Sequence, residues 1–181
     1  HLHSAALTVY VKAGSRYETP KNNGLSHFLE HMFFRGSERY PTSYELNEAI
    51  EQRGGTLQAT TSRDYTCYYL RTHPTLVDGG IEILGELLRA PRFGQIDVER
   101  QIVMEEVLED FDEDGADICV DDIARTEMWP DHPLGYKIVG SRENILGFND
   151  ADLRRHQSEF YGASNLVFAA VGAVTRAEVV K

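Results

Sequence analysis

The stretch His27-Phe28-Leu29-Glu30-His31 decides how the rest of the chain is interpreted. On a helix, residues four apart lie one above the other, so His27 and His31 share one face, and Glu30 lies about 60° around the helix from His27. Two imidazoles at this spacing predict a metal site with a base beside it. Zinc sites of the catalytic kind use three protein ligands and leave a fourth position for water. We therefore expect one more ligand from elsewhere in the chain.

Apolar residues surround the two histidines: Phe28, Leu29, Met32 and Phe33. They predict a helix that is buried on most sides, which is an unusual environment for histidines that bind nothing. Asn23 is the expected N-cap of this helix, and Gly36 is expected to end it. A pair of solvated histidines on a surface helix is the alternative interpretation.

A second helix, expected at 98–111 after an N-cap at Asp97, supplies the candidate third ligand. At 100° per residue, Glu99 and Glu106 point in nearly the same direction, two turns apart and among apolar neighbours. Carboxylates in an apolar stripe are costly unless a cation or a proton compensates them. Glu105 points about 100° away from Glu106. Glu106 is therefore the best candidate for the missing metal ligand.

The net charge of −11, from 29 acidic and 18 basic residues, argues against nucleic acid and anionic membranes as partners. Much of the acidity lies in 105–122, which is either a solvated helix end and loop or a wall that attracts basic peptides. No apolar run approaches the roughly 18 residues that a membrane span needs. We expect a soluble protein, and the sequence does not distinguish a cytoplasmic from a periplasmic or organellar location.

Periodicity predicts an α+β fold, a mostly antiparallel sheet of about five strands with helices packed mainly on one face. The segments with strand patterns are 7–11, 56–61, 65–71 and 166–171, of which the middle two read as a hairpin. Further helices are expected at 42–54, 74–91, 116–128 and 149–161, with another starting at Thr175. We expect one domain over 1–181, cut from a longer protein at both ends.

The pattern His27-x-x-Glu30-His31, followed by Glu99 and Glu106, resembles the inverted zinc-binding motif of the pitrilysin and insulin-degrading metallopeptidases (M16-like inverzincins), a family that includes the mitochondrial processing peptidase. Supporting matches run along nearly the whole chain: Ala13-Gly14-Ser15-Arg16, Gly54-Gly55, His132-Pro133-Leu134-Gly135 and Asn165-Leu166-Val167. The resemblance implies a metallopeptidase domain that forms half of a closed chamber.

The resemblance also implies roles for the residues of the site. His27, His31 and Glu106 would bind one zinc ion, and Glu30 would be the general base for the attacking water. Glu99, seven residues before the third ligand, would support the site and be required for activity. An acid favoured by the dipole at a helix N-terminus is the alternative interpretation of Glu99.

In the family that this chain resembles, the strand after the Gly-Gly turn is a sheet edge near the zinc, and the substrate peptide adds to it as a further strand. The matching residues are Gln58, Ala59, Thr60 and Thr61. Relatives usually carry Asn at the position of Gln58, so this chain departs from the side-chain pattern there. Main-chain hydrogen bonds at Ala59 do not depend on that side chain.

Members of the family use at least two such domains, and the second supplies an arginine and a tyrosine at the substrate carbonyl. The chain contains no internal repeat of the motif. We therefore expect the second homologous domain in the parent chain or in a partner subunit. The predicted function is that of a zinc-dependent endopeptidase domain that hydrolyses peptides or unfolded segments and is poorly active alone.

Two other functions are compatible with parts of the pattern. A non-catalytic, peptide-binding or structural subunit of the same family would typically have lost motif residues, and this chain has kept them. A thioether lyase with an H-x-x-E-H helix would need a cysteine at its active site, and neither Cys67 nor Cys119 is placed to match it. We therefore treat both cysteines as small core or half-buried residues.

Overall fold

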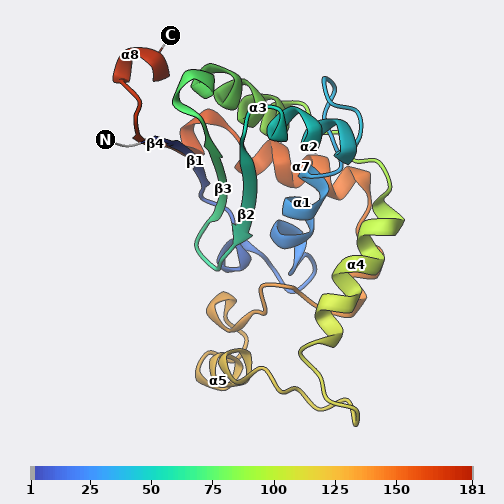
Figure 1. Ribbon diagram of the computed structural model, residues 1–181. Coiled ribbons are helices and arrows are strands. Elements are labelled where there is room, and N and C mark those ends of the chain that lie inside the picture. Colours follow the sequence, from blue (N-terminus) through green and yellow to red (C-terminus); the bar gives the residue numbers. More distant parts are fainter. Residues whose placement is uncertain (1–2, 181) are drawn as a thin grey trace.

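The computed structural model describes residues 3–180 and shows helices packed on an open antiparallel sheet (Figure 1). The strands are β1 (Ala5–Val11), β2 (Thr56–Thr61), β3 (Thr66–Thr72) and β4 (Leu166–Gly172), in the spatial order β2-β3-β1-β4. The predicted α+β class and antiparallel sheet are confirmed. The described residues contain four strands rather than about five. β2 and β4 are the two edges of this sheet.

Alternating side chains give the sheet one apolar face. In the central strand β1, Leu7, Val9 and Val11 are buried, whereas Tyr10 is exposed on the opposite face. Val9 lies opposite Tyr68 in β3. Because successive strand residues point to opposite faces, this register gathers the apolar side chains under the helices.

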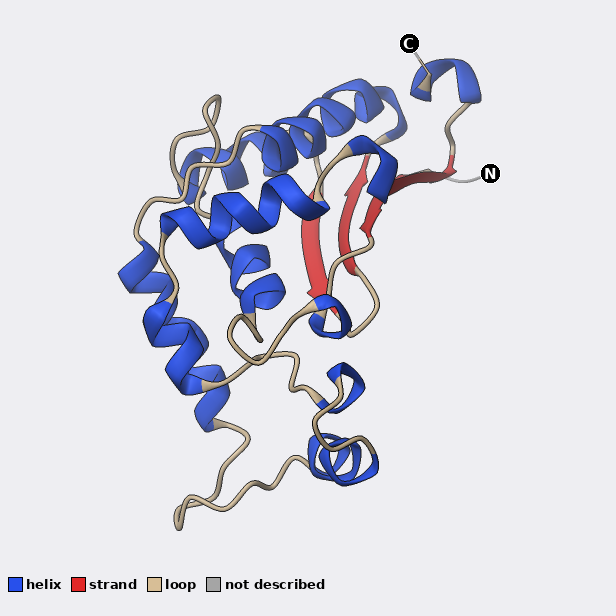
Figure 2. Ribbon diagram, turned by 180° about the vertical axis from the view of Figure 1, so that it is seen from behind, coloured by secondary structure: helices blue, strands red, loops and turns tan. Residues whose placement is uncertain are grey.

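The helices are α1 (Leu25–Phe33), α2 (Ser43–Glu51), α3 (Val77–Arg89), α4 (Ile96–Leu108), α5 (Val120–Met128), α6 (Arg142–Gly147), α7 (Asp150–Phe160) and α8 (Arg176–Val179). α1 contacts β2 and β3, and α3 contacts β1 and β3. α4 and α7 pack in turn against α1, while α5 stands apart from the sheet (Figure 2). α1 thus lies between the sheet and α4. None of the described helices is long and apolar enough to cross a membrane.

The predicted caps and helix ends are partly confirmed. Thr42 caps α2, and Asn149 caps α7. The helix expected at 98–111 is α4, which begins earlier, after Gln95 in the left-handed region (φ 57°), and ends at Leu108, so Asp97 lies inside its first turn. The helix expected from 116 begins only at Val120. The side chain of Asp112 accepts hydrogen bonds from two backbone amides downstream and so stabilises a turn in place of the first helical residues.

Candidate metal centre

A buried carboxylate anchors the N-terminus of α1, the helix that carries the H-x-x-E-H motif. Glu18 accepts hydrogen bonds from the backbone amides of Gly24 (2.8 Å) and Ser26 (2.7 Å). The predicted N-cap, Asn23, is wrong: Gly24 occupies that position with φ 97°, and the Asn23 amide donates to Glu18 and to the carbonyl of Lys137. The reason is that the Glu18 carboxylate already satisfies the free amides of the first turn.

A second contact fixes α1 against α7. The hydroxyl of Ser26 lies 3.0 Å from Nε2 of His156, and both side chains are buried. Burial, and next the charge of Arg155, lower the pKa of His156 to about 4. The imidazole is therefore neutral near pH 7, and it holds the start of α1 through a hydrogen bond rather than an ion pair.

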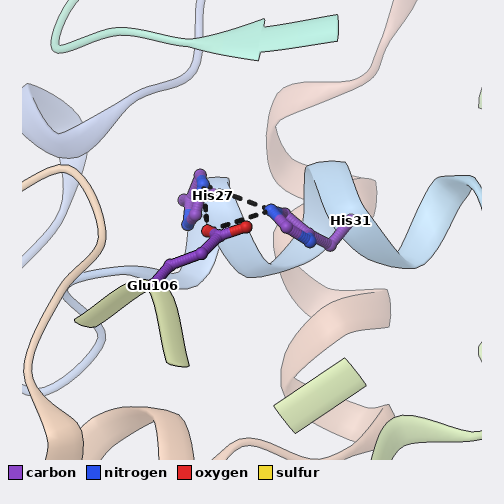
Figure 3. Close-up of side chains that lie close together, drawn as sticks. All are labelled: His27, His31 and Glu106. Carbon is purple, nitrogen blue, oxygen red and sulfur yellow. Dashed lines mark hydrogen bonds and ion pairs between the residues drawn. The ribbon is translucent and has the colours of Figure 1, made fainter. Parts of the chain in front are cut away.

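α1 and α4 bring three potential ligand atoms together (Figure 3). Nε2 of His27 and Nε2 of His31 are 3.3 Å apart, and each lies 3.5 Å from Oε2 of Glu106. A tetrahedron with zinc–ligand bonds of about 2.0–2.2 Å has edges of about 3.3–3.6 Å. The donor set and these three separations therefore fit a zinc ion with one tetrahedral corner left open.

The two imidazoles of this cluster differ in protonation. Burial lowers the pKa of His31, but the hydrogen bond to Glu99 and the charge of Glu106 outweigh it and leave that pKa raised. Burial, followed by the proximity of His31, lowers the pKa of His27 to about 3, so its imidazole is in the neutral form that binds metals. Burial raises the pKa of Glu106, which His31 opposes. Oε2 of Glu106 lies near two imidazole nitrogens, and no Lys or Arg of the described residues 3–180 forms an ion pair with it.

Glu99 lies directly behind one of the candidate ligands. Its Oε1 is 2.8 Å from Nδ1 of His31, and Arg35 donates to its Oε2. Burial raises the pKa of Glu99, but the hydrogen bonds from His31 and Arg35 outweigh it and leave the pKa below its usual value. A carboxylate on the second nitrogen of a ligand histidine is the usual partner in zinc sites, where it fixes the ring and its tautomer. The structure thus brings the carboxylate of Glu99 into contact with His31, one of the candidate ligands.

Arg35, which follows His31 by four residues, was not singled out from the sequence. α1 ends at Phe33, so Arg35 lies in the turn after the helix, and helical spacing alone does not account for its contact with Glu99.

Glu30 is buried beside the two candidate ligand histidines and has one hydrogen-bond partner. The hydroxyl of Thr61 donates to Oε2 of Glu30 at 2.5 Å. Burial raises the pKa of Glu30, and the Thr61 hydrogen bond lowers it in part. A small polar cavity of about 280 Å³ opens next to Glu30 and is lined also by Asn47 of α2. Glu30 therefore borders a space that a small polar group can enter.

The four residues expected to bind substrate lie on β2, which pairs only with β3 and has a free outer edge among the described residues. Ala59 and Thr61 are half-buried, whereas Gln58 and Thr60 are exposed. This alternation places Thr61 on the helix-covered face with Glu30, and it places the Gln58 side chain on the other face. The structure brings Thr61 into the site but not the side chain of Gln58.

α4, which carries Glu106, is held by a few apolar side chains and by polar contacts: Val103 and Val107 belong to the core, and Ile96 and Met104 pack against it. Only three of its 13 residues are buried: Glu99, Val103 and Val107. Arg100 donates from Nη2 to the carbonyl of Phe148 at 2.7 Å and from Nε to that of Ile145 at 3.2 Å. The candidate ligand from α4 thus depends on a helix with a small apolar interface.

A second group of potential ligands lies beyond the end of α4. Ligand atoms of Asp110, Cys119 and Asp122 all lie within 4.8 Å of one another. Two side-chain cations already occupy this cluster: Lys137 Nζ is 3.6 Å from Asp110, and Arg63 Nη2 is 2.7 Å from Asp122. Cys67 and Cys119 are both free thiols.

A His-x-x-Glu-His helix with a glutamate from a second helix defines the inverted class of zinc-peptidase sites. Residues 1–142 match the model of the insulinase family, peptidase family M16, and the chain belongs to that family. The resemblance noted in the sequence is thereby confirmed.

Two curated relatives show what this chain is similar to. The chain is 33% identical to the uncharacterized zinc protease YmxG of Bacillus subtilis over 95% of this chain and 42% of the relative. It is 37% identical to the beta subunit of the mitochondrial-processing peptidase of Blastocladiella emersonii, over 99% of this chain and 38% of the relative. The chain thus spans about two fifths of the length of these proteins.

Solved structures show the same fold. A protease from Helicobacter pylori superposes with a TM-score of 0.88 at 25% identity, over 98% of this chain and 42% of that one. A domain from Pseudomonas fluorescens, described as an inactive peptidase M16 domain, superposes with a TM-score of 0.87 at 17% identity, over 99% of this chain and 43% of that one. The fold therefore occurs both in proteases and in a domain described as inactive.

Proposed function

We propose that residues 1–181 form a single catalytic domain of a zinc-dependent endopeptidase. The observation that carries this proposal is the convergence of His27, His31 and Glu106 at tetrahedral spacing, with Glu30 and His31 lining the same cavity. These three residues would hold one zinc ion. The bacterial relative, which is named as a zinc protease, supports the same metal and the same reaction.

Zinc in such a site polarises the scissile carbonyl and makes water more acidic. Glu30 then has two tasks: it accepts a proton from the attacking water, and it delivers that proton to the leaving amine. Its burial supports this role, because a carboxylate with a raised pKa can release a proton as well as accept one. Glu99 holds His31 with Nδ1 engaged, so that Nε2 is free to face the ligand cluster.

The free edge of β2 is the surface on which a peptide substrate would bind. A peptide can add to an exposed strand through main-chain hydrogen bonds, which require an extended substrate but no particular side chains. Gln58, Ala59, Thr60 and Thr61 would supply these backbone groups. The Thr61–Glu30 hydrogen bond, which joins this strand to the proposed base, supports that role. The proposed substrates are therefore peptides or unfolded segments.

We propose further that full activity requires a second homologous domain or subunit. Two observations support this: the curated relatives are more than twice as long as this chain, and one of them is named as a beta subunit. A non-catalytic peptide-binding subunit is the alternative function. The domain with this fold that is described as inactive supports this alternative. Retention of all five proposed site residues distinguishes the catalytic proposal from that alternative.

The test is Glu30→Gln in the full-length protein, purified with its partner where it has one. We expect zinc content to be unchanged, and hydrolysis of a fluorescence-quenched peptide library to fall at least about 100-fold. Glu48→Gln on the exposed side of α2 is the matched control and should retain activity. Undiminished cleavage by Glu30→Gln would refute the base assignment, and a parent protein without zinc or peptidase activity would refute the proposed function.

A further inference from the structure

The base Glu30 and the edge strand β2 are connected by a single side chain. Thr61 is the last residue of β2, and its hydroxyl lies 2.5 Å from Oε2 of Glu30. The same hydroxyl lies 3.3 Å from Oγ1 of Thr66, its cross-strand neighbour in β3. Thr61 carries one hydroxyl proton and so can donate to only one of these two acceptors.

The neighbours decide which acceptor receives that proton. Thr66 is fully buried, and its own hydroxyl donates to the carbonyl of Ala13 at 3.1 Å. The Thr61–Thr66 contact is long and joins two neutral groups, whereas the Thr61–Glu30 contact is short and its acceptor is a carboxylate. Charge-assisted hydrogen bonds are the shorter and stronger ones. The Thr61 proton is therefore directed at Glu30.

Buried hydroxyl groups lie behind Thr61 on the helix-covered face of the sheet. The hydroxyl of Tyr161, at the end of α7, lies 2.9 Å from that of Tyr68 in β3. Tyr68 is fully buried. The Tyr68–Tyr161 contact ties β3 to α7, and the Thr66 hydroxyl that faces Thr61 is itself bound to the carbonyl of Ala13.

We propose that Thr61 is a positioning residue for Glu30: its side chain orients the carboxylate of the base, while its backbone belongs to the strand on which the peptide binds. This rests on the proposed function. The side chain acts on the base and the backbone on the substrate, so the two contributions are separable. Loss of the hydroxyl should impair the chemical step more than peptide binding.

The test compares Thr61→Val, which keeps the shape and removes the hydroxyl, with Thr61→Ser, which keeps the hydroxyl. In the full-length protein, Thr61→Val should lower kcat about 10- to 100-fold, as expected for loss of a hydrogen bond to a charged group, with KM little changed. Thr61→Ser should restore most of kcat. Thr8→Val, on the central strand and on the sheet face opposite the helices, is the matched control and should behave as the parent does.

Two further readouts do not depend on activity. Zinc content should be the same in all variants, and a crystal structure of Thr61→Val should show the Glu30 carboxylate rotated from its parent position. An unchanged kcat, an unmoved carboxylate, or a loss of kcat that Ser does not restore would each overturn the proposal. If the parent protein proves inactive, the proposed function fails, and the position of the carboxylate in the crystal alone decides the inference.

Discussion

Two clusters in this chain each gather three potential metal ligands, and they differ in what compensates their charge. In the first, His27, His31 and Glu106 come from two helices. In the second, Asp110 and Asp122 are paired with Lys137 and Arg63. Proximity of ligand atoms is therefore a poor indicator of a metal by itself. The informative feature is whether the protein already supplies its own cation to those atoms.

The largest expected effect separates the two clusters directly. His31→Ala should weaken zinc binding by more than about 100-fold, because even the outer partners of zinc ligands are worth about 10- to 100-fold in affinity. Cys119→Ser, in the second cluster, should leave zinc binding unchanged. Metal content after dialysis and competition with a chromophoric chelator measure both. If the parent protein bound a second equivalent of zinc and Cys119→Ser did not, the second cluster would be a metal site and the comparison would be wrong.

At low pH, zinc can be lost from the first cluster in two ways: the ligands become protonated, or α1 unfolds. The titration of His156, which contacts α1, allows the two effects to be separated. Its pKa is about 4 in the folded protein against 6.5 for a free imidazole. As the pH falls, His156 is protonated in the unfolded chain before it is protonated in the folded protein. The stability that depends on neutral His156 is therefore fully present above pH 6.5 and is lost as the pH falls towards 4. The loss is about 3 kcal/mol.

We therefore expect His156→Gln, which cannot titrate but can still bind Ser26, to lose less stability than the parent between pH 6.5 and 4. Urea unfolding of the metal-free protein across this range provides the free energies. Parallel pH profiles for the parent and the variant would show that His156 is not the titrating group.

A smaller effect on zinc affinity is expected from Glu99, which contacts the candidate ligand His31. Glu99→Gln keeps the size of the side chain but removes the charge that faces His31 and Arg35. Zinc affinity should fall about 10- to 100-fold, less than for His31→Ala, since the three direct ligands remain. The chelator competition described for His31 measures it. An affinity equal to that of the parent would support the alternative in which Glu99 is only a helix N-terminal acid.

The smallest expected effect concerns the second cluster. Lys137→Met removes a cation that lies 2.6 Å from Asp117 and 3.6 Å from Asp110. Because these carboxylates are partly exposed, we expect a loss of only about 1–2 kcal/mol in the free energy of unfolding. Lys21→Met, at an exposed position, is the matched control. Lys137→Met with unchanged stability would mean that the lysine does not compensate the cluster.

Much of the site was predictable because its signals are local or periodic. The spacing of His27, Glu30 and His31 depends only on helical geometry, and the near coincidence of Glu99 and Glu106 follows from the same 100° step. The structure places all five together, as the sequence predicted, while their chemical roles stay proposals. Local caps such as Thr42 and Asn149 were predictable for the same reason.

What could not be predicted depends on groups that meet only in the folded chain. Glu18 replaces Asn23 at the start of α1 because the preceding 3-10 turn brings its carboxylate back to the helix. The Thr61–Glu30 hydrogen bond joins residues 31 positions apart, and no periodicity signals it. The early start of α4 requires Gln95 in a left-handed conformation, which non-glycine residues seldom adopt.

The small apolar interface of α4 has a thermodynamic consequence. An ion bound by His27, His31 and Glu106 would cross-link two helices whose ligands are 75 positions apart in the chain, counted from His31 to Glu106. Binding that occurs only in the folded form adds its free energy to that of folding. Because few buried side chains hold α4, the free energy of zinc binding would be a large share of the free energy that keeps this helix packed on the domain. Zinc supply would then determine how much of the protein is correctly assembled, in addition to how fast it works.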